Sequence, residues 1–124
     1  MTTLGARLAH VAPGEVDLAF ALRPELTQQN GFLHAGAVAA VADSACGYAA
    51  FTLAPAGTDV LAVEFKINLL APARAPSFVA RGRVVRAGRT LTVCRADVVG
   101  LGDDGTETLV ATMQSTIIVL PNRS

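Results

Sequence analysis

One almost wholly apolar stretch, residues 30–54, constrains the fold of this chain more than any other segment. It reads NGFLHAGAVAAVADSACGYAAFTLA, with Ala, Val and Leu on every helical face instead of along one stripe. A helix of this composition is expected to be buried on all sides. At a rise of about 1.5 Å per residue, the part from His34 to Leu53 would be roughly 30 Å long, enough to cross a small domain.

The single acid of this stretch, Asp43, lies near its centre. An ionised carboxylate held away from water without a partner costs several kcal/mol, so its presence needs a reason. One interpretation is structural: backbone N–H groups or a neighbouring Arg satisfy a buried acid. Because the rest of the helix is so apolar, we favour a functional role for Asp43.

A membrane-spanning helix is the alternative interpretation, because about twenty apolar residues can cross a bilayer. A central Asp would oppose insertion by on the order of 2.5–3.5 kcal/mol. The apolar residues are mostly weakly hydrophobic Ala, and no basic cluster flanks either end. We therefore expect a core helix and no membrane association.

The remaining segments predict strands. Alternating apolar residues from Val16 to Leu22 indicate a strand within residues 8–22, next to a Pro13–Gly14 turn. Alternation and turn residues predict four more strands after the helix, over residues 60–70, 77–86, 90–99 and 107–120. A strand, a long helix and a run of strands form an α+β pattern, in which an antiparallel sheet would curl around the helix. This arrangement is the hotdog fold.

Composition limits the classes of function. The length of 124 residues suits a single domain, 1–124, that buries a core without disulfides or metals. Ten basic and ten acidic side chains leave no net charge to attract nucleic acid or an anionic membrane. The apolar fraction of 52% exceeds the usual share, which favours a homo-oligomer that covers apolar surface.

The two cysteines, Cys46 and Cys94, show neither a CxxC motif nor metal-ligand spacing. We expect buried, reduced thiols in a reducing compartment and no metal site. A catalytic thiol at Cys46 is the less favoured alternative, since no basic partner is near it in sequence. The N-terminal residues lack a signal-peptide apolar region, which favours a cytoplasmic location.

Three segments together form a recognisable pattern. The segment GFLHAG at residues 31–36 is followed by an acid nine residues after its histidine. A strand-like segment, VEFKINLLAPA, occupies residues 63–73, and a Gly-Arg-Thr turn occupies residues 88–90. This pattern, over about residues 14–119, resembles the PaaI-type (phenylacetate-pathway) branch of the hotdog-fold acyl-CoA thioesterases. The resemblance implies a tetramer built of dimers, active sites at the dimer interface, a coenzyme A thioester as substrate and no separate cofactor.

The resemblance also implies roles for individual residues. The helix acid, here Asp43, would be the nucleophile or the general base. The backbone N–H after the histidine, here that of Ala35, would bind the thioester oxygen, and His34 would help to hold the site. The family usually has Gly where this chain has Ala35, but the backbone N–H is unchanged.

Two further positions differ from the family pattern. Gln28 stands where Asn is common, with Asn30 close by, and its role would be to position water. Ala62 stands where some members place Ser or Thr, so that auxiliary hydroxyl is missing.

The residues themselves indicate how such a site could be assembled. A helix N-terminus offers unpaired N–H groups to an oxyanion, and His34, Ala35 and Gly36 lie at that end. An acid in an apolar site should have a raised pKa and be a better base. Nine residues place His34 and Asp43 on opposite helix faces, roughly 13 Å apart along the axis. If both serve one reaction, two antiparallel helices of a dimer must share the sites.

Coenzyme A also carries phosphates. Arg86, Arg89 and Thr90 cluster at a Gly turn that could bind one of them, and a solvated hairpin tip is an equal alternative. Arg74 is a weaker candidate for the same role. The alternating Glu64, Lys66 and Asn68 are interpreted as an ordinary polar strand face, and contact of one of them with the ligand is the less favoured alternative.

Hydrolysis of an acyl-CoA is the leading functional hypothesis. A non-catalytic acyl-CoA-binding or sensing domain is the alternative, which the Ala62 substitution leaves open. A dehydratase is disfavoured, because that chemistry needs a His and an acid together. Phe32, Tyr48 and Phe51 could line an acyl tunnel, but they do not distinguish aryl from medium-chain acyl groups.

Overall fold

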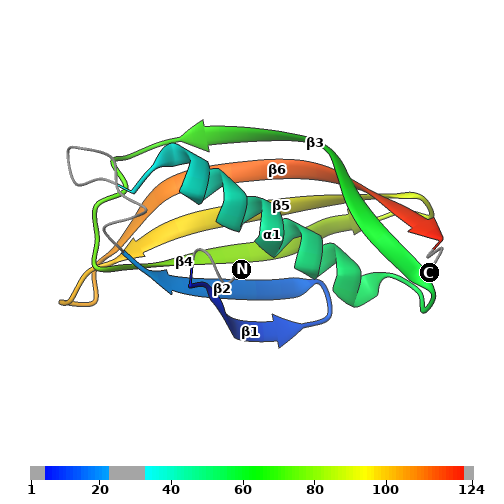
Figure 1. The fold of residues 1–124 in the computed structure, drawn as a ribbon, viewed down its shortest axis with the longest axis horizontal. Coiled ribbons are helices and arrows are strands. Elements are labelled where there is room, and N and C mark those ends of the chain that lie inside the picture. Colours follow the sequence, from blue (N-terminus) through cyan, green and yellow to red (C-terminus); the bar gives the residue numbers. More distant parts are fainter. Residues whose placement is uncertain (1–4, 23–32, 122–124) are drawn as a thin grey trace.

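The computed structural model describes residues 5–22 and 33–121, which form one long helix and a six-stranded antiparallel sheet. The elements in chain order are β1 (Arg7–Ala12), β2 (Glu15–Ala21), α1 (Ala35–Leu53), β3 (Thr58–Leu69), β4 (Ser77–Ala87), β5 (Leu91–Leu101) and β6 (Glu107–Pro121). The strand order is β1-β2-β4-β5-β6-β3, and α1 crosses one face of the sheet (Figure 1). The predicted α+β arrangement is confirmed.

The prediction of one strand before the helix is wrong. Residues 7–21 form a hairpin in which β1 and β2 pair antiparallel around the Pro13–Gly14 turn. Gly14 adopts a φ of 76°, a conformation that glycine tolerates better than other residues. Because β1 is exposed along almost its whole length, its sequence shows no apolar alternation. The four later strands lie within a few residues of their predicted bounds.

The expectation that α1 is buried on all sides is also wrong for the single chain. Eight helix residues are buried against the sheet: Ala37, Val38, Val41, Ala42, Ala45, Cys46, Ala49 and Ala50. Tyr48 and Phe51 lie on the uncovered side. By length and composition α1 could cross a membrane, but here its buried side packs on the sheet as a core helix does. The sheet covers one side of the helix, which leaves apolar side chains exposed.

A close approach between α1 and β4 depends on Gly82. A Cβ atom at Gly82 would overlap the carbonyl group of Ala45 on the helix. Below the helix, the rings of Phe20 and Phe78 stack with centroids 5.3 Å apart. A larger residue at Gly82 would push the helix away from this core.

The two thiols belong to the same core. Cys46 and Cys94 are both buried and free. Desolvation raises the pKa of the Cys46 thiol to about 12 and that of Cys94 to about 11. Cys46 is therefore a protonated, buried thiol at neutral pH, and a nucleophilic role does not fit it.

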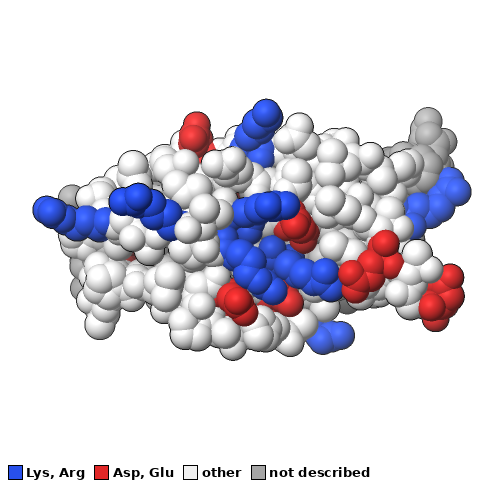
Figure 2. Space-filling model, turned by 180° about the vertical axis from the view of Figure 1, so that it is seen from behind, with Lys and Arg blue, Asp and Glu red and all other residues white. Residues whose placement is uncertain are grey.

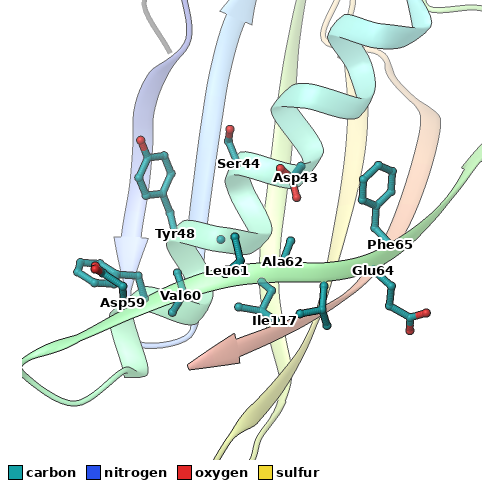
Figure 3. A pocket seen from close by; sticks show the side chains of 13 residues that line it. Asp43, Ser44, Tyr48, Asp59, Val60, Leu61, Ala62, Glu64, Phe65 and Ile117 are labelled. Atoms are coloured by element: carbon teal, nitrogen blue, oxygen red, sulfur yellow. The ribbon is translucent and has the colours of Figure 1, made fainter. Parts of the chain in front are cut away.

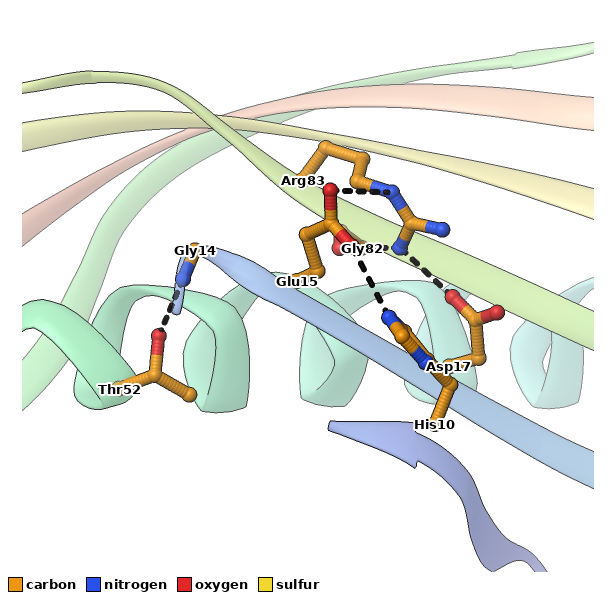
Figure 4. Close-up of polar contacts among 7 residues, drawn as sticks. All are labelled: His10, Gly14, Glu15, Asp17, Thr52, Gly82 and Arg83. Atoms are coloured by element: carbon orange, nitrogen blue, oxygen red, sulfur yellow. Dashed lines mark hydrogen bonds and ion pairs between the residues drawn. The ribbon is translucent and has the colours of Figure 1, made fainter. Parts of the chain in front are cut away.

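Polar contacts fix the β1–β2 hairpin to its neighbours (Figure 4). The Gly14 N–H donates to the Thr52 hydroxyl near the end of α1, at 2.7 Å. On β4, the Arg83 guanidinium donates to Asp17 of β2 at 2.6 Å. His10 forms an exposed contact of 2.9 Å with Glu15. The first two contacts connect the hairpin to the helix and to β4, and the third joins β1 to β2 within the hairpin.

The sheet face opposite the helix is polar. Figure 2 shows Lys and Arg side chains among Asp and Glu side chains over the middle of this face. Arg81 pairs with Glu107 at 3.1 Å, and the Thr112 hydroxyl donates to Asp97 at 2.7 Å. Glu64 of β3 accepts from the Thr116 hydroxyl of β6 at 3.2 Å. These charged side chains make polar contacts across strands, as is usual for a solvated sheet face.

Candidate active site

A groove of about 860 Å³ lies between the middle of α1 and strand β3 (Figure 3). Asp43 and Phe65 project into it from opposite sides. Its lining residues are Asp43, Ser44, Gly47, Tyr48 and Phe51 of α1, Asp59 to Phe65 of β3, and Ile117 of β6. Apart from Asp43, Asp59 and Glu64, these residues carry no charge, so the groove suits an apolar group beside a carboxylate.

The Asp43 carboxylate is half-buried and receives no hydrogen bond from residues 5–22 or 33–121. Burial raises its pKa, because the ionised form loses hydrating water. The raised pKa agrees with the expectation for an acid in an apolar site. Asp43 is therefore a stronger base than a free carboxylate and has a lone pair available to a bound molecule.

His34 caps the N-terminus of α1. Its imidazole Nδ1 accepts a hydrogen bond from the backbone N–H of Gly36 at 2.9 Å. A Cβ atom at Gly36 would lie 3.1 Å from Nδ1, which is tight. The His-x-Gly spacing thus has a local reason: the glycine leaves room for the ring. With Nδ1 as the acceptor, the neutral ring carries its proton on Nε2 and can donate it outward.

The first turn of α1 leaves one backbone donor available. The N–H groups of Ala37 and Val38 both donate to the His34 carbonyl, at 2.9 and 3.1 Å, and that of Gly36 donates to the His34 ring. The N–H of Ala35 has no acceptor in the described part of the chain. It lies at the positive end of the helix dipole, where a negative oxygen is favoured.

The two halves of the predicted site lie in different cavities of the single chain. His34 and Ala35 line a cavity of about 350 Å³ with residues of β3 and of the segment that follows it, among them Leu69 and Pro72. Asp43 lines the larger groove and not this cavity. The separation agrees with the helix spacing, which places the two groups on different faces.

The predicted phosphate-binding residues lie at the far end of β4. Arg86, Arg89 and Thr90 are exposed around the turn into β5, and none of them lines either cavity. Gly88 shapes the turn, because a Cβ atom there would lie 2.7 Å from the Leu91 carbonyl oxygen. Gln28 and Asn30 lie outside the described residues. No group of three or more His, Cys, Asp or Glu side chains placed to hold a metal occurs among the described residues.

Sequence reasoning missed several groove residues, among them Ser44, Gly47 and Phe65. Ser44 and Gly47 follow Asp43 on the helix, and Phe65 faces it from β3. The spacing of Asp43, Gly47 and Phe51 at four-residue intervals places them on one helix face, a signal that could have identified Gly47. No local signal indicates that Phe65 lies opposite Asp43, since that depends on how the sheet is ordered.

Comparisons with known proteins match this fold. The Thioesterase superfamily model matches residues 30–106. A thioesterase family protein from Silicibacter pomeroyi is 50% identical with a TM-score of 0.95, and the match covers 98% of this chain and 89% of that one. A point mutant of the phenylacetic acid degradation protein PaaI from Thermus thermophilus is 30% identical with a TM-score of 0.82, covering 95% and 96% of the two chains.

Two curated relatives are also similar over part of their length. The Saccharolobus solfataricus proteins SSO2140 and SSO1253, whose names propose that they are esterases, are 31% and 34% identical over 90 residues, or 73% of this chain. The chain spans 64% and 59% of the lengths of these two relatives. Together with the antiparallel sheet and the long helix across it, these similarities place the chain in the Thioesterase superfamily, within its PaaI-type hotdog-fold branch.

Proposed function

We propose that this chain hydrolyses coenzyme A thioesters at active sites shared between two copies of the chain. One observation carries the proposal: a half-buried carboxylate without a partner among the described residues, Asp43, faces an apolar groove in a thioesterase fold. The available oxyanion donor, the N–H of Ala35, lies in another cavity. Two copies can bring both groups to one carbonyl.

The edge of β3 supports such an assembly. This strand pairs with β6 on one side only and is the last strand of the sheet. Leu61, Val63 and Phe65 are each at least half exposed along it, at 57%, 53% and 50%. An exposed apolar edge strand is ordinarily covered in the native assembly. A second copy related by a two-fold axis would cover it and could place one helix N-terminus near the other copy's groove.

The mechanism follows from these positions. The Ala35 N–H of one copy donates to the thioester oxygen and stabilises the oxyanion that forms. In the general-base route, Asp43 of the second copy takes a proton from water, whose oxygen attacks the carbonyl carbon. Collapse of the tetrahedral intermediate breaks the C–S bond, and the leaving thiolate takes the proton. In the nucleophilic route, Asp43 attacks the carbonyl carbon itself, the C–S bond breaks and the thiolate leaves; water then hydrolyses the resulting anhydride, which releases the free acid and restores the Asp43 carboxylate.

Other residues complete the proposed site. Gln28, Asn30 and the outward-facing Nε2–H of His34 orient water or the leaving thiolate. The Arg86, Arg89 and Thr90 turn binds a coenzyme A phosphate. The apolar groove accepts an aryl or medium-chain acyl group. No further cofactor takes part, and two dimers associate into a tetramer.

A non-catalytic acyl-CoA-binding domain is the second candidate. It is favoured by Ala62, which lines the groove and carries no hydroxyl where some family members have one. Release of free thiol from a panel of acyl-CoA thioesters distinguishes the two candidates. Tight binding of an acyl-CoA by the wild-type chain without thiol release would support the binding domain and reject hydrolysis.

Mixed oligomers test the shared site. The variants Ala35→Pro and Asp43→Asn each remove one half of it and should each be nearly inactive. When the two variants are coexpressed in equal amounts and pair at random, about half of the dimers are mixed, and one of the two sites in each mixed dimer is intact. About a quarter of wild-type thiol release should therefore return. No recovery from verified mixed oligomers would show that each site lies within a single chain.

A further inference from the structure

Gly47 is the one glycine among the described residues that neither packing nor backbone conformation explains. Four glycines, at positions 5, 14, 57 and 105, have positive φ angles. At positions 36, 82, 88, 100 and 102, a Cβ atom would lie 3.1 Å or less from another atom. At Gly47, a Cβ atom would meet no heavy atom within 4 Å, and the residue is helical.

A glycine in the interior of a helix is destabilising relative to alanine. Gly47 lies in the middle of α1, one turn after Asp43 and one turn before Phe51. The three residues share one helix face, and all three line the groove. The helix face that carries Asp43 and Phe51 therefore lacks a side chain at the position between them.

The groove that contains this gap is lined by aromatic side chains. Tyr48, Phe51 and Phe65 all line the groove and are 46%, 52% and 50% exposed. The other two described aromatic residues, Phe20 and Phe78, stack inside the core. Every aromatic side chain of the described residues that is not in the core thus borders the space beside Asp43.

We propose that Gly47 determines substrate specificity: the space above it holds the acyl group of a thioester whose carbonyl is at Asp43, and a side chain there would limit acyl size. This inference rests on the proposed thioesterase function. An acyl chain that runs from Asp43 along the helix toward Phe51 passes directly over Gly47. An acetyl group ends before it reaches that position, whereas a hexanoyl or benzoyl group extends over it.

The test compares wild type, Gly47→Ala and Gly47→Leu with acetyl-CoA, hexanoyl-CoA and benzoyl-CoA as substrates. In Gly47→Leu, kcat/KM for hexanoyl-CoA and benzoyl-CoA should fall at least about tenfold more than for acetyl-CoA, since a few misplaced methylenes are worth that much in an apolar pocket. Gly47→Ala should shift the same ratio in the same direction by a smaller factor. Its melting temperature should rise, because alanine favours the helix.

Ala40 provides the matched control. It is exposed on the same helix and does not line the groove, so Ala40→Leu should leave the ratio of long-chain to acetyl activity unchanged. Equal losses on all three thioesters in the Gly47 variants, or a lower melting temperature of Gly47→Ala, would overturn the role of Gly47. A wild-type protein that releases no thiol would instead reject the proposed function, and this inference with it.

Discussion

Replacing Ala35 with proline removes one hydrogen-bond donor while it keeps the helix. Ala35 is the first residue of α1, the helical position where proline is well tolerated. The preceding residue, His34, has φ −63° and ψ 137°, the extended conformation favoured before proline. Since the Ala35 N–H has no acceptor in the described part of the chain, the fold loses no hydrogen bond there.

The catalytic effect should nevertheless be large. If the Ala35 N–H stabilises the oxyanion, its removal should lower kcat by about 10²–10³, equivalent to about 2.7–4 kcal/mol of transition-state stabilisation. The free energy of unfolding should change by no more than about 0.5 kcal/mol, as at an ordinary surface position. The structure therefore predicts a catalytic loss without a loss of stability.

Thiol release from an acyl-CoA gives kcat, and urea titration gives the free energy of unfolding. Ala35→Ser is the control, because it changes the side chain and keeps the backbone N–H. It should retain kcat within about threefold of wild type, a loss of less than 1 kcal/mol. If Ala35→Pro also keeps kcat within that range while it folds normally, another group binds the oxyanion and our assignment of the helix N-terminus is wrong.

The remaining predictions concern Asp43 and Gly82. Asp43→Asn should lower kcat by about 10²–10⁴, the usual contribution of a general base. Burial raises the pKa of Asp43 in the folded state above its ordinary value of 3.8. The contribution of this group to the free energy of unfolding therefore falls as the pH rises from below 3.8 to above the raised pKa. Wild-type kcat/KM should rise over the same pH interval. Thermal unfolding at pH 7 should show Asp43→Asn to be more stable than wild type, and a less stable variant would contradict the burial cost assigned to Asp43. Gly82→Ala should lower the free energy of unfolding by about 1–3 kcal/mol in urea titration, because its methyl group would overlap the Ala45 carbonyl; an unchanged midpoint would refute that contact.

Much of the fold follows from local patterns. The helix, Ala35–Leu53, lies within the predicted apolar stretch of residues 30–54, and the side chain of the predicted opening histidine, His34, caps its start. The four later strands were predictable because apolar alternation and turn residues are properties of neighbouring positions. The β1–β2 hairpin was missed because an exposed strand has no apolar face and leaves no such alternation.

The sequence by itself determined the long apolar helix, its one acid, the histidine at its start and the distance between them. It could do so because the axial distance and the rotation between two residues of a helix depend only on how many residues separate them. Tertiary structure alone decided that β3 lies at the sheet edge beside β6, and that one side of α1 stays uncovered. It also placed Phe65 across from Asp43 and opened the groove over Gly47. These features depend on which distant strands pair, and the periodicity of a single strand carries no information about its neighbours.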